Sequence, residues 1–270
     1  MDFNDIERRG LILLGGGNMG SAMLARWLGQ GLRPDAVQVI TPRPSEWLKS
    51  TGVRLGGDLL ADPALVLIAV KPQKVTEALP QLARFGGGRT VFVSVAAGRT
   101  LASYEAILGA ATPLVRAMPN TASSIGQGMT AIVGNGAARD GDLALAEGLL
   151  RAVGDVVRLT SEDQMDAVTA VSGSGLAYVF HLIETLAAAG VAEGLPEDLA
   201  LRLARATVAG AGAMAVQAET DPAQLRANVT SPGGTTAAAL AVLMDEQTGF
   251  PALLKRAVHA ATERGRELGK

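Results

Sequence analysis

Residues 11–20 decide the fold of the first half of this chain, and they read Leu11-Ile12-Leu13-Leu14-Gly15-Gly16-Gly17-Asn18-Met19-Gly20. Four apolar residues run into a G-x-G-x-x-G pattern, and residues 22–28 then have helical character. In this context the glycines permit a tight strand-to-helix turn and let a pyrophosphate approach the helix N-terminus. The pattern predicts a dinucleotide contact at Gly15, Gly16, Gly17, Asn18 and Met19. A glycine-rich turn without a ligand is the alternative.

Short apolar segments recur through the first half of the chain, with helical segments between them. We expect strands at residues 11–14, 37–41, 65–70, 91–95, 114–118, 130–133 and 155–159, and helices at 22–28, 73–83 and 143–153. Continuous apolar strands separated by helices are typical of a parallel sheet covered on both faces. Residues 1–160 are therefore predicted to form an α/β, Rossmann-like domain with a parallel sheet.

The composition changes near residue 160, and no strand is expected after it. Helical stretches follow at residues 166–189, 196–219, 222–227, 236–244 and 251–268. Small-residue patches at 172–175 and 209–213 lie within these stretches, although glycine inside a helix costs about 1 kcal/mol relative to alanine. Close helix–helix contact offsets such a cost. Residues 161–270 are therefore predicted to form an all-α dimerisation domain, with a monomeric helical bundle as the alternative.

The ends of three expected strands provide further cofactor contacts. An acid after the second strand binds the ribose of NAD, but residues 37–44 contain no acid and include Arg43. A cation there suits a 2′-phosphate, which predicts NADPH as the cofactor, with NADH as a weaker alternative. Arg43 as a plain solvated residue is the other interpretation. Ligands bind beyond the carboxyl ends of parallel strands, so we also expect contacts from Ala69, Val70, Lys71, Pro72, Ala96 and Ala97.

Near the C-terminus, residues 228–236 read Asn-Val-Thr-Ser-Pro-Gly-Gly-Thr-Thr, followed by an alanine-rich run. Proline and glycine break regular structure, whereas alanine favours a helix. Residues 233–236 are therefore expected at a helix N-terminus, where free N–H groups and the helix dipole attract anions. This pattern indicates a pocket for a small carboxylate, lined by hydroxyl groups. An ordinary turn between two helices is the alternative.

Composition excludes several classes of function. The chain has 270 residues, 48% hydrophobic and 19% charged, and a formal net charge of −2, so the basic surface typical of nucleic-acid binding is not expected. It has no cysteine, and its two histidines lack metal-ligand spacing, so no metal site is expected. No uninterrupted apolar run approaches the roughly 18 residues that span a membrane. We expect a cytoplasmic protein that binds no membrane.

Five segments together resemble the pyrroline-5-carboxylate reductase family, and the likeness covers essentially the whole chain. They are residues 15–19, 69–72, 116–121, 166–175 and 228–236. Each segment is modest alone, whereas their order and spacing are specific. The chain departs from the family pattern at Ala122 and Leu176, where proline is usual, and at Met244, where an acid or amide is common. None of these changes removes a group that the chemistry plainly needs.

The resemblance implies NADPH-dependent reduction of the cyclic imine 1-pyrroline-5-carboxylate to L-proline, the last step of proline biosynthesis. It implies a helical domain interlocked with that of a second copy, in dimers that assemble into rings such as a decamer. It also implies that Glu162 lies at the substrate site and Asn228 beside the cofactor, and that the substrate carboxylate and ring are held by Ser231, Gly234, Thr235 and Thr236. We hypothesise that Thr236 is the catalytic residue and mainly orients the imine, since a threonine hydroxyl is a poor acid.

Two other functions compete with this interpretation. A β-hydroxyacid dehydrogenase also joins a nucleotide domain to helices, but it uses a lysine of the helical domain. Here residues 161–270 contain only Lys255 and Lys270, both outside such a motif. A non-catalytic NADP-binding sensor is the second competitor, and it would bind the cofactor without reducing any imine.

Overall fold

The protein was analysed as a computed structural model, which describes residues 3–269. The chain up to Gly173, together with the stretch from Thr262 onward, forms one compact unit, and Ser174–Ala261 forms a second. We call them the sheet unit and the helical unit. The division expected between residues 160 and 161 stays a prediction about the functional domains.

One eight-stranded sheet organises the sheet unit, with strand order β3-β2-β1-β4-β5-β6-β7-β8. Neighbouring strands from β3 to β6 run parallel, and β7 is antiparallel to β6 but parallel to β8. The α/β fold class is confirmed, but the sheet is mixed rather than wholly parallel. The strands are β1 (Leu11–Leu14), β2 (Val37–Ile40), β3 (Arg54–Leu55), β4 (Leu65–Ile68), β5 (Val91–Ser94), β6 (Leu114–Pro119), β7 (Gly128–Gly134) and β8 (Gly154–Arg158).

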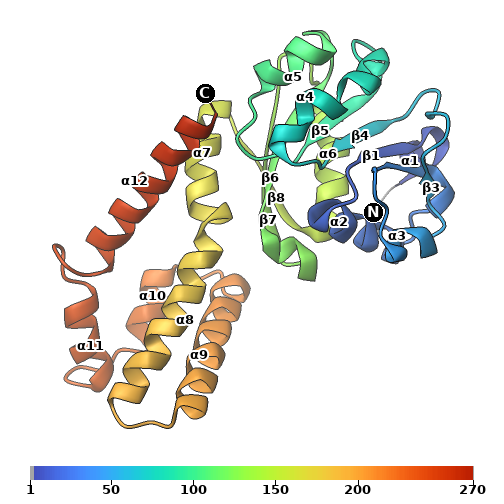
Figure 1. Ribbon diagram of the computed structural model, residues 1–270. Coiled ribbons are helices and arrows are strands. Elements are labelled where there is room, and N and C mark those ends of the chain that lie inside the picture. The colour runs from blue at the N-terminus through green and yellow to red at the C-terminus, as the bar shows by residue number, and fades with distance from the viewer. Residues whose placement is uncertain (1–2, 270) are drawn as a thin grey trace. The chain divides into compact units, whose positions relative to one another are not determined.

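Helices lie over both faces of this sheet (Figure 1). The helices of this unit before Ser174 are α1 (Asn4–Arg9), α2 (Asn18–Gly29), α3 (Glu46–Ser50), α4 (Val75–Ala78), α5 (Leu101–Leu108) and α6 (Asp140–Leu150), followed by α7 (Met165–Val168), which lies apart from the sheet. The single helix expected at residues 73–83 is instead a 3-10 turn, α4 and a second 3-10 turn, because Pro72 and Pro80 each start a new turn. The short elements α1, α3, β3 and α5 were not predicted.

Two apolar clusters pack against the two faces of the sheet. Along β1 the side chains alternate between them: Leu11 and Leu13 join one cluster, Ile12 and Leu14 the other. All four residues are buried. A strand buried on both faces is continuously apolar, which explains why this short run could be predicted as a strand from the sequence. The sheet is therefore a rigid support for the loops at its carboxyl edge.

The second unit contains α8 (Gly175–Ala192), α9 (Glu197–Gln217), α10 (Pro222–Asn228), α11 (Thr235–Leu243) and the first part of α12 (Phe250–Leu268). Helices α8 and α9 approach closely at Gly190, where an added Cβ atom would lie 3.3 Å from the Cβ of Ala200. At Gly210 and Gly212 an added Cβ would meet nothing within 4 Å. Packing within the described chain therefore explains the first glycine but not the other two.

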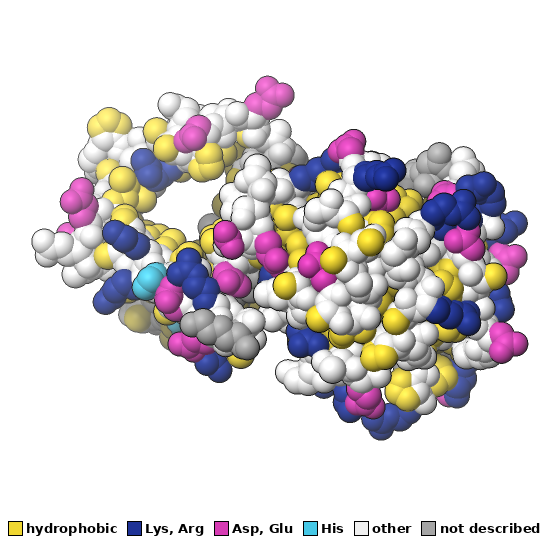
Figure 2. All heavy atoms as spheres, turned by 90° about the horizontal axis from the view of Figure 1, so that it is seen from above, with side chains coloured by type: hydrophobic (Ala, Val, Ile, Leu, Met, Phe, Trp, Pro, Cys, Tyr) yellow, Lys and Arg dark blue, Asp and Glu magenta, His cyan; other side chains and the backbone are white. Residues whose placement is uncertain are grey.

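Two helical stretches, Glu162–Ala192 and Glu197–Gln217, are long and apolar enough to cross a membrane by length and composition alone. The sequence analysis considered only uninterrupted apolar runs, and such a count does not detect these two helices. Large apolar side chains stay exposed on these helices, including Phe180 and Leu203, and Figure 2 shows hydrophobic side chains open to solvent on one face of the molecule. Exposed apolar surface of this kind marks protein–protein or membrane contacts.

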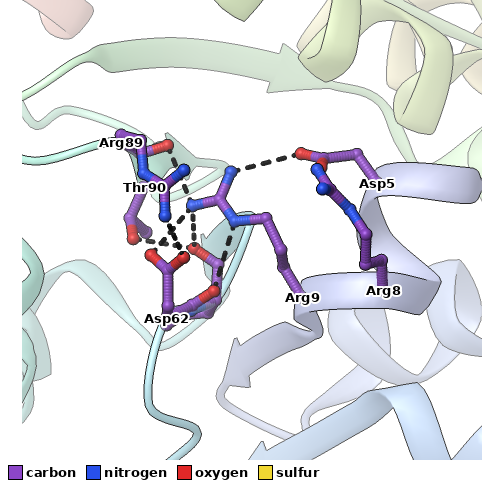
Figure 3. Close-up of polar contacts among 7 residues, drawn as sticks. Asp5, Arg8, Arg9, Asp62, Arg89 and Thr90 are labelled. Carbon is purple, nitrogen blue, oxygen red and sulfur yellow. Dashed lines mark hydrogen bonds and ion pairs between the residues drawn. The ribbon is translucent and has the colours of Figure 1, made fainter.

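A polar network holds the amino ends of β1, β4 and β5 together (Figure 3). Arg9 donates to the backbone oxygens of Asp62, Pro63 and Arg89 and pairs with the carboxylates of Asp5 and Asp62. The buried hydroxyl of Thr90 donates to the Pro63 oxygen at 2.7 Å. This network lies at the edge of the sheet opposite the carboxyl ends, where no ligand contact was expected.

Candidate active site

The strand order reverses between β1 and β4, and ligands of open α/β sheets bind beside such a switch point. Gly15 follows β1 at this point with a φ of +110°, which favours glycine. A Cβ atom there would lie 2.7 Å from the carbonyl carbon of Ala69, the residue that follows β4. The structure thus brings together two of the segments that were predicted to bind the cofactor.

The other glycines of the motif differ in what surrounds them. An added Cβ at Gly20 would lie 2.4 Å from the Gly15 oxygen, and one at Gly16 would lie 2.6 Å from a methyl carbon of Leu48. At Gly17 it would meet nothing within 4 Å, although the φ of −77° suits any residue. Packing therefore requires glycine at the first and last positions but not at Gly17. That open position suits the close approach of a ligand to the backbone.

The N-terminus of α2 fits the pyrophosphate of a dinucleotide. Gly17 is the N-cap residue and provides no side-chain hydrogen bond to the first turn, which contains Asn18 and Met19. The first N–H groups of a helix have no partner within the helix and attract anions. The first turn contains no acidic residue that would repel a phosphate. The residues present therefore fit the predicted cofactor.

Arg43 lies three residues beyond the end of β2 and is exposed. Among the described residues it forms no ion pair or hydrogen bond, so its charge is available to a ligand. The backbone N–H of Gly15 donates to the oxygen of Ile40 at 2.9 Å, so the end of β2 adjoins the glycine loop. Lys71 is likewise exposed beyond β4, with Val70 before it and Pro72 starting the next turn.

The end of β5 provides Ala96, which is buried, and Ala97, which is exposed. Beneath them lie two buried residues that the sequence analysis missed. The hydroxyl oxygens of Ser94 and Tyr104 are 2.5 Å apart, and the Ala96 N–H donates to the Ser94 oxygen at 3.2 Å. Burial is the main cause that raises the pKa of Tyr104, so its hydroxyl stays neutral at ordinary pH. Neither residue stands in a recognisable motif, so no sequence signal identified them.

Glu162 is fixed by two donors from separate elements of the sheet unit. Arg116 on β6 pairs with its Oε1 at 2.7 Å, and the first N–H of α5, from Leu101, donates to the same oxygen at 2.8 Å. The Arg116 side chain is buried, whereas that of Glu162 is 27% exposed. Glu162 therefore has a fixed position together with some access to solvent, as a substrate contact requires.

A π-helical turn, Thr169–Gly173, follows α7, and π turns often occur at functional sites. Its Ser172 oxygen atoms accept from the Asn120 side chain, at 3.2 Å for the hydroxyl. Asn120 follows β6 directly and also accepts the N–H of Met129. Asn120 and Ser172 belong to segments that carried the resemblance, but the sequence did not show that they touch.

In the helical unit, α11 begins at Thr235 with Gly234 as its N-cap residue, as the sequence predicts to within one residue. Gly233 has a φ of +70°, and the Gly234 N–H donates to the Ser231 oxygen at 3.1 Å. No side chain caps the first turn, so its N–H groups, including that of Thr236, are open to an anion. Asn228 ends the preceding α10 and accepts from Gln224.

The predicted site residues thus form two groups. Those of the cofactor motif and strand ends, with Glu162, lie in the sheet unit, and Asn228 to Thr236 lie in the helical unit. Within residues 3–269 no three His, Cys, Asp or Glu side chains are grouped to hold a metal ion. The roles assigned to both groups remain predictions.

Each of the two units contains residues that match a known protein-family model. Residues 162–268 match the family model for pyrroline-5-carboxylate reductase dimerisation, and residues 10–98 match a model described as NADP oxidoreductase, coenzyme F420-dependent. Over 265 residues the chain is 41% identical to a pyrroline-5-carboxylate reductase from a Synechocystis species, covering 96% of this chain and 97% of the relative. This chain belongs to the pyrroline-5-carboxylate reductase family. The family expected from the five sequence segments is confirmed.

Solved pyrroline-5-carboxylate reductases share the fold. The structure of the enzyme from Coxiella burnetii has a TM-score of 0.92 and 35% identity, covering 97% of this chain and 99% of that one. The Plasmodium falciparum enzyme, solved with NADP bound, has a TM-score of 0.82 and 27% identity, covering 98% and 99%. The chain is therefore an NADP-type oxidoreductase of this family, and it contains the family's dimerisation region.

Proposed function

We propose that this chain reduces 1-pyrroline-5-carboxylate to L-proline with NADPH, the last step of proline biosynthesis. Family membership supports the reaction, and the observation that carries it to this chain is the open backbone at Gly17 above the uncapped N-terminus of α2. NADPH, when bound, supplies the hydride that adds to the C=N carbon, and a proton on the ring nitrogen completes the amine.

The residues of the sheet unit hold the cofactor. The N–H groups at the start of α2 bind the pyrophosphate, and the exposed, unpaired Arg43 binds the 2′-phosphate. The strand ends at Ala69–Pro72 and Ala96–Ala97 orient the rest of the molecule in the crevice beyond β4 and β5. A charge-assisted contact from Arg43 explains a preference for NADPH over NADH. Asn228 is assigned to the cofactor by family resemblance.

The residues of the helical unit hold the substrate carboxylate. The free N–H groups of Thr235 and Thr236 provide two donors at the start of α11, and Gly234 permits close approach. The negative charge of the carboxylate thus fixes the substrate, and the Ser231 hydroxyl lies beside the carboxylate. The Thr236 hydroxyl then orients the ring nitrogen, and Glu162 is assigned to the substrate by family resemblance. Holding the imine in this way is a matter of proximity and orientation, which needs no histidine or lysine.

The catalytic assignment of Thr236 is tested by two conservative variants. Thr236→Val removes the hydroxyl but keeps the shape and the backbone N–H, so kcat should fall about tenfold or more while KM for the imine changes little. Thr235→Val, its immediate neighbour, is the matched control and should keep kcat within about threefold. If Thr236→Val has wild-type kinetics, Thr236 does not orient the imine.

We further propose a homodimer with interlocked helical units, assembled into rings such as a decamer, in the cytoplasm. Support comes from the dimerisation region and from the exposed Phe180 and Leu203, which are 58% and 48% exposed on α8 and α9. Burying such half-exposed residues against a second copy stabilises the assembly by about 1–1.5 kcal/mol each, roughly half the value for a fully exposed side chain. Sedimentation of Leu203→Arg should show monomers. Trp47→Arg, at a 40% exposed site of the sheet unit, should sediment as the wild type does.

A further inference from the structure

The turn between β5 and α5 is supported from below by buried hydroxyl groups. Ser94 is the last residue of β5, and its oxygen accepts the N–H of Ala96. The same oxygen lies 2.5 Å from the Tyr104 hydroxyl, which comes from the second turn of α5. Ser94 is 3% and Tyr104 1% exposed. A buried polar group is held strongly by the few partners it has, so these contacts fix Ala96 relative to α5.

Helix α5 is in turn fixed to Glu162. Leu101, the first residue of α5, donates its N–H to Glu162 Oε1, which also binds the buried guanidinium of Arg116. Tyr104 lies three residues further along the same helix, so the two contacts lie on neighbouring turns. One short helix therefore connects the end of β5, where a cofactor contact is expected, with the carboxylate expected at the substrate.

The position of β5 decides which half of the cofactor this turn faces. The 2′-phosphate is expected at the end of β2, on one side of the switch point between β1 and β4. A dinucleotide crosses that point, so its other half lies over the ends of β4 and β5. The turn at Ala96 and Ala97 is therefore on the nicotinamide side.

We infer that the Ser94–Tyr104 pair positions the turn at Ala96 and Ala97 against the nicotinamide half of the cofactor. Tyr104 is thus a positioning residue, acting through Ser94 and the Ala96 N–H rather than by touching the substrate. The inference rests on the proposed function, because it requires that NADPH binds in this crevice. It goes beyond that function by assigning a role to two buried residues beneath the site.

Tyr104→Phe is the direct test, because it removes one hydroxyl and keeps the ring in the core. The matched control is Thr90→Val, which removes another buried hydroxyl, that of the residue preceding β5 at the opposite edge (Figure 3). Binding of NADPH and of 2′,5′-ADP, which lacks the nicotinamide, is measured by calorimetry for each protein. This readout requires no imine and no turnover.

For Tyr104→Phe we expect Kd for NADPH to rise about fivefold, the effect of one lost hydrogen bond, while Kd for 2′,5′-ADP stays unchanged. Thr90→Val should change neither value. Ser94→Ala should reproduce the effect of Tyr104→Phe, and the double variant should be no worse than either single one, since both break the same connection. Equal changes for both ligands, or none for NADPH, would overturn the inference. If the wild type binds NADPH but reduces no pyrroline-5-carboxylate, the proposed reaction fails and the positioning role stands.

Discussion

Gly15 and Ala69 touch so closely that a side chain on Gly15 would overlap the backbone after β4: the added Cβ would lie 2.7 Å from the Ala69 carbonyl carbon. Gly17, two residues later, has open space around it. The same motif therefore contains one glycine required by the fold and another whose small size the fold does not require.

This difference predicts opposite effects of two alanine substitutions. Gly15→Ala should lower the free energy of unfolding by at least about 2 kcal/mol, since it adds a clash to a left-handed φ. Gly17→Ala should cost less than about 1 kcal/mol, yet weaken NADPH binding tenfold or more by filling the space of the ligand. Thermal unfolding and calorimetry measure the two effects. An intact NADPH affinity in Gly17→Ala would show that the cofactor does not approach this position.

Arg43 is predicted to determine the choice between NADPH and NADH. Because it is exposed and has no partner among the described residues, Arg43→Ala should not destabilise the protein. Loss of a charge-assisted contact worth about 1.5–3 kcal/mol should raise KM for NADPH about tenfold to a hundredfold and leave KM for NADH unchanged. Arg54→Ala, an exposed arginine on β3, is the control. Equal effects on both cofactors would refute the assignment.

Because Glu162 pairs with the buried Arg116, replacing Glu162 by glutamine should destabilise the protein more than the same substitution at Glu147. Glu162→Gln leaves the buried Arg116 guanidinium without a counter-charge and should lower the free energy of unfolding by about 1–3 kcal/mol. Glu147→Gln is matched in chemistry, but its partners Arg151 and Arg158 are 52% and 37% exposed. It should cost less than about 1 kcal/mol. Urea unfolding compares them, and equal losses would contradict the role given to burial.

Tyr104 makes stability depend on pH in the alkaline range. Its pKa is raised above the ordinary 10.0, mainly by burial, so the folded protein holds this proton more tightly than the unfolded chain. The resulting stability is fully present below pH 10 and is lost as the pH rises through the folded-state pKa. The difference in Tm between wild type and Tyr104→Phe should therefore shrink above pH 10. A difference that stays constant there would show that Tyr104 ionises alike in both states.

The sequence predicted those elements that are determined by neighbouring residues, but not those that depend on tertiary contacts. The run Leu11–Leu14 and the glycines after it define a strand and a turn by themselves, and the start of α11 follows from Pro232, two glycines and alanines. The antiparallel β7 was missed because direction is decided by tertiary pairing with β6. The contact of Ser94 with Tyr104 was missed because β5 and α5 are brought together by packing around it.

The exposed apolar faces of two helices were missed for a related reason. Phe180 and Leu203 belong to helices whose apolar side chains remain exposed within one chain. A count of uninterrupted apolar residues does not detect a surface that is assembled from successive helical turns. The dimerisation region matched over residues 162–268 supports the proposal that a second copy of the chain covers this surface.

The proposed reaction is tested most directly by following the oxidation of NADPH by the purified protein in the presence of pyrroline-5-carboxylate, with L-proline measured as the product. We expect one proline to form for each NADPH consumed, and slower turnover when NADH replaces NADPH. Binding of NADPH without any oxidation by this imine would contradict the proposed function and favour a non-catalytic nucleotide-binding protein.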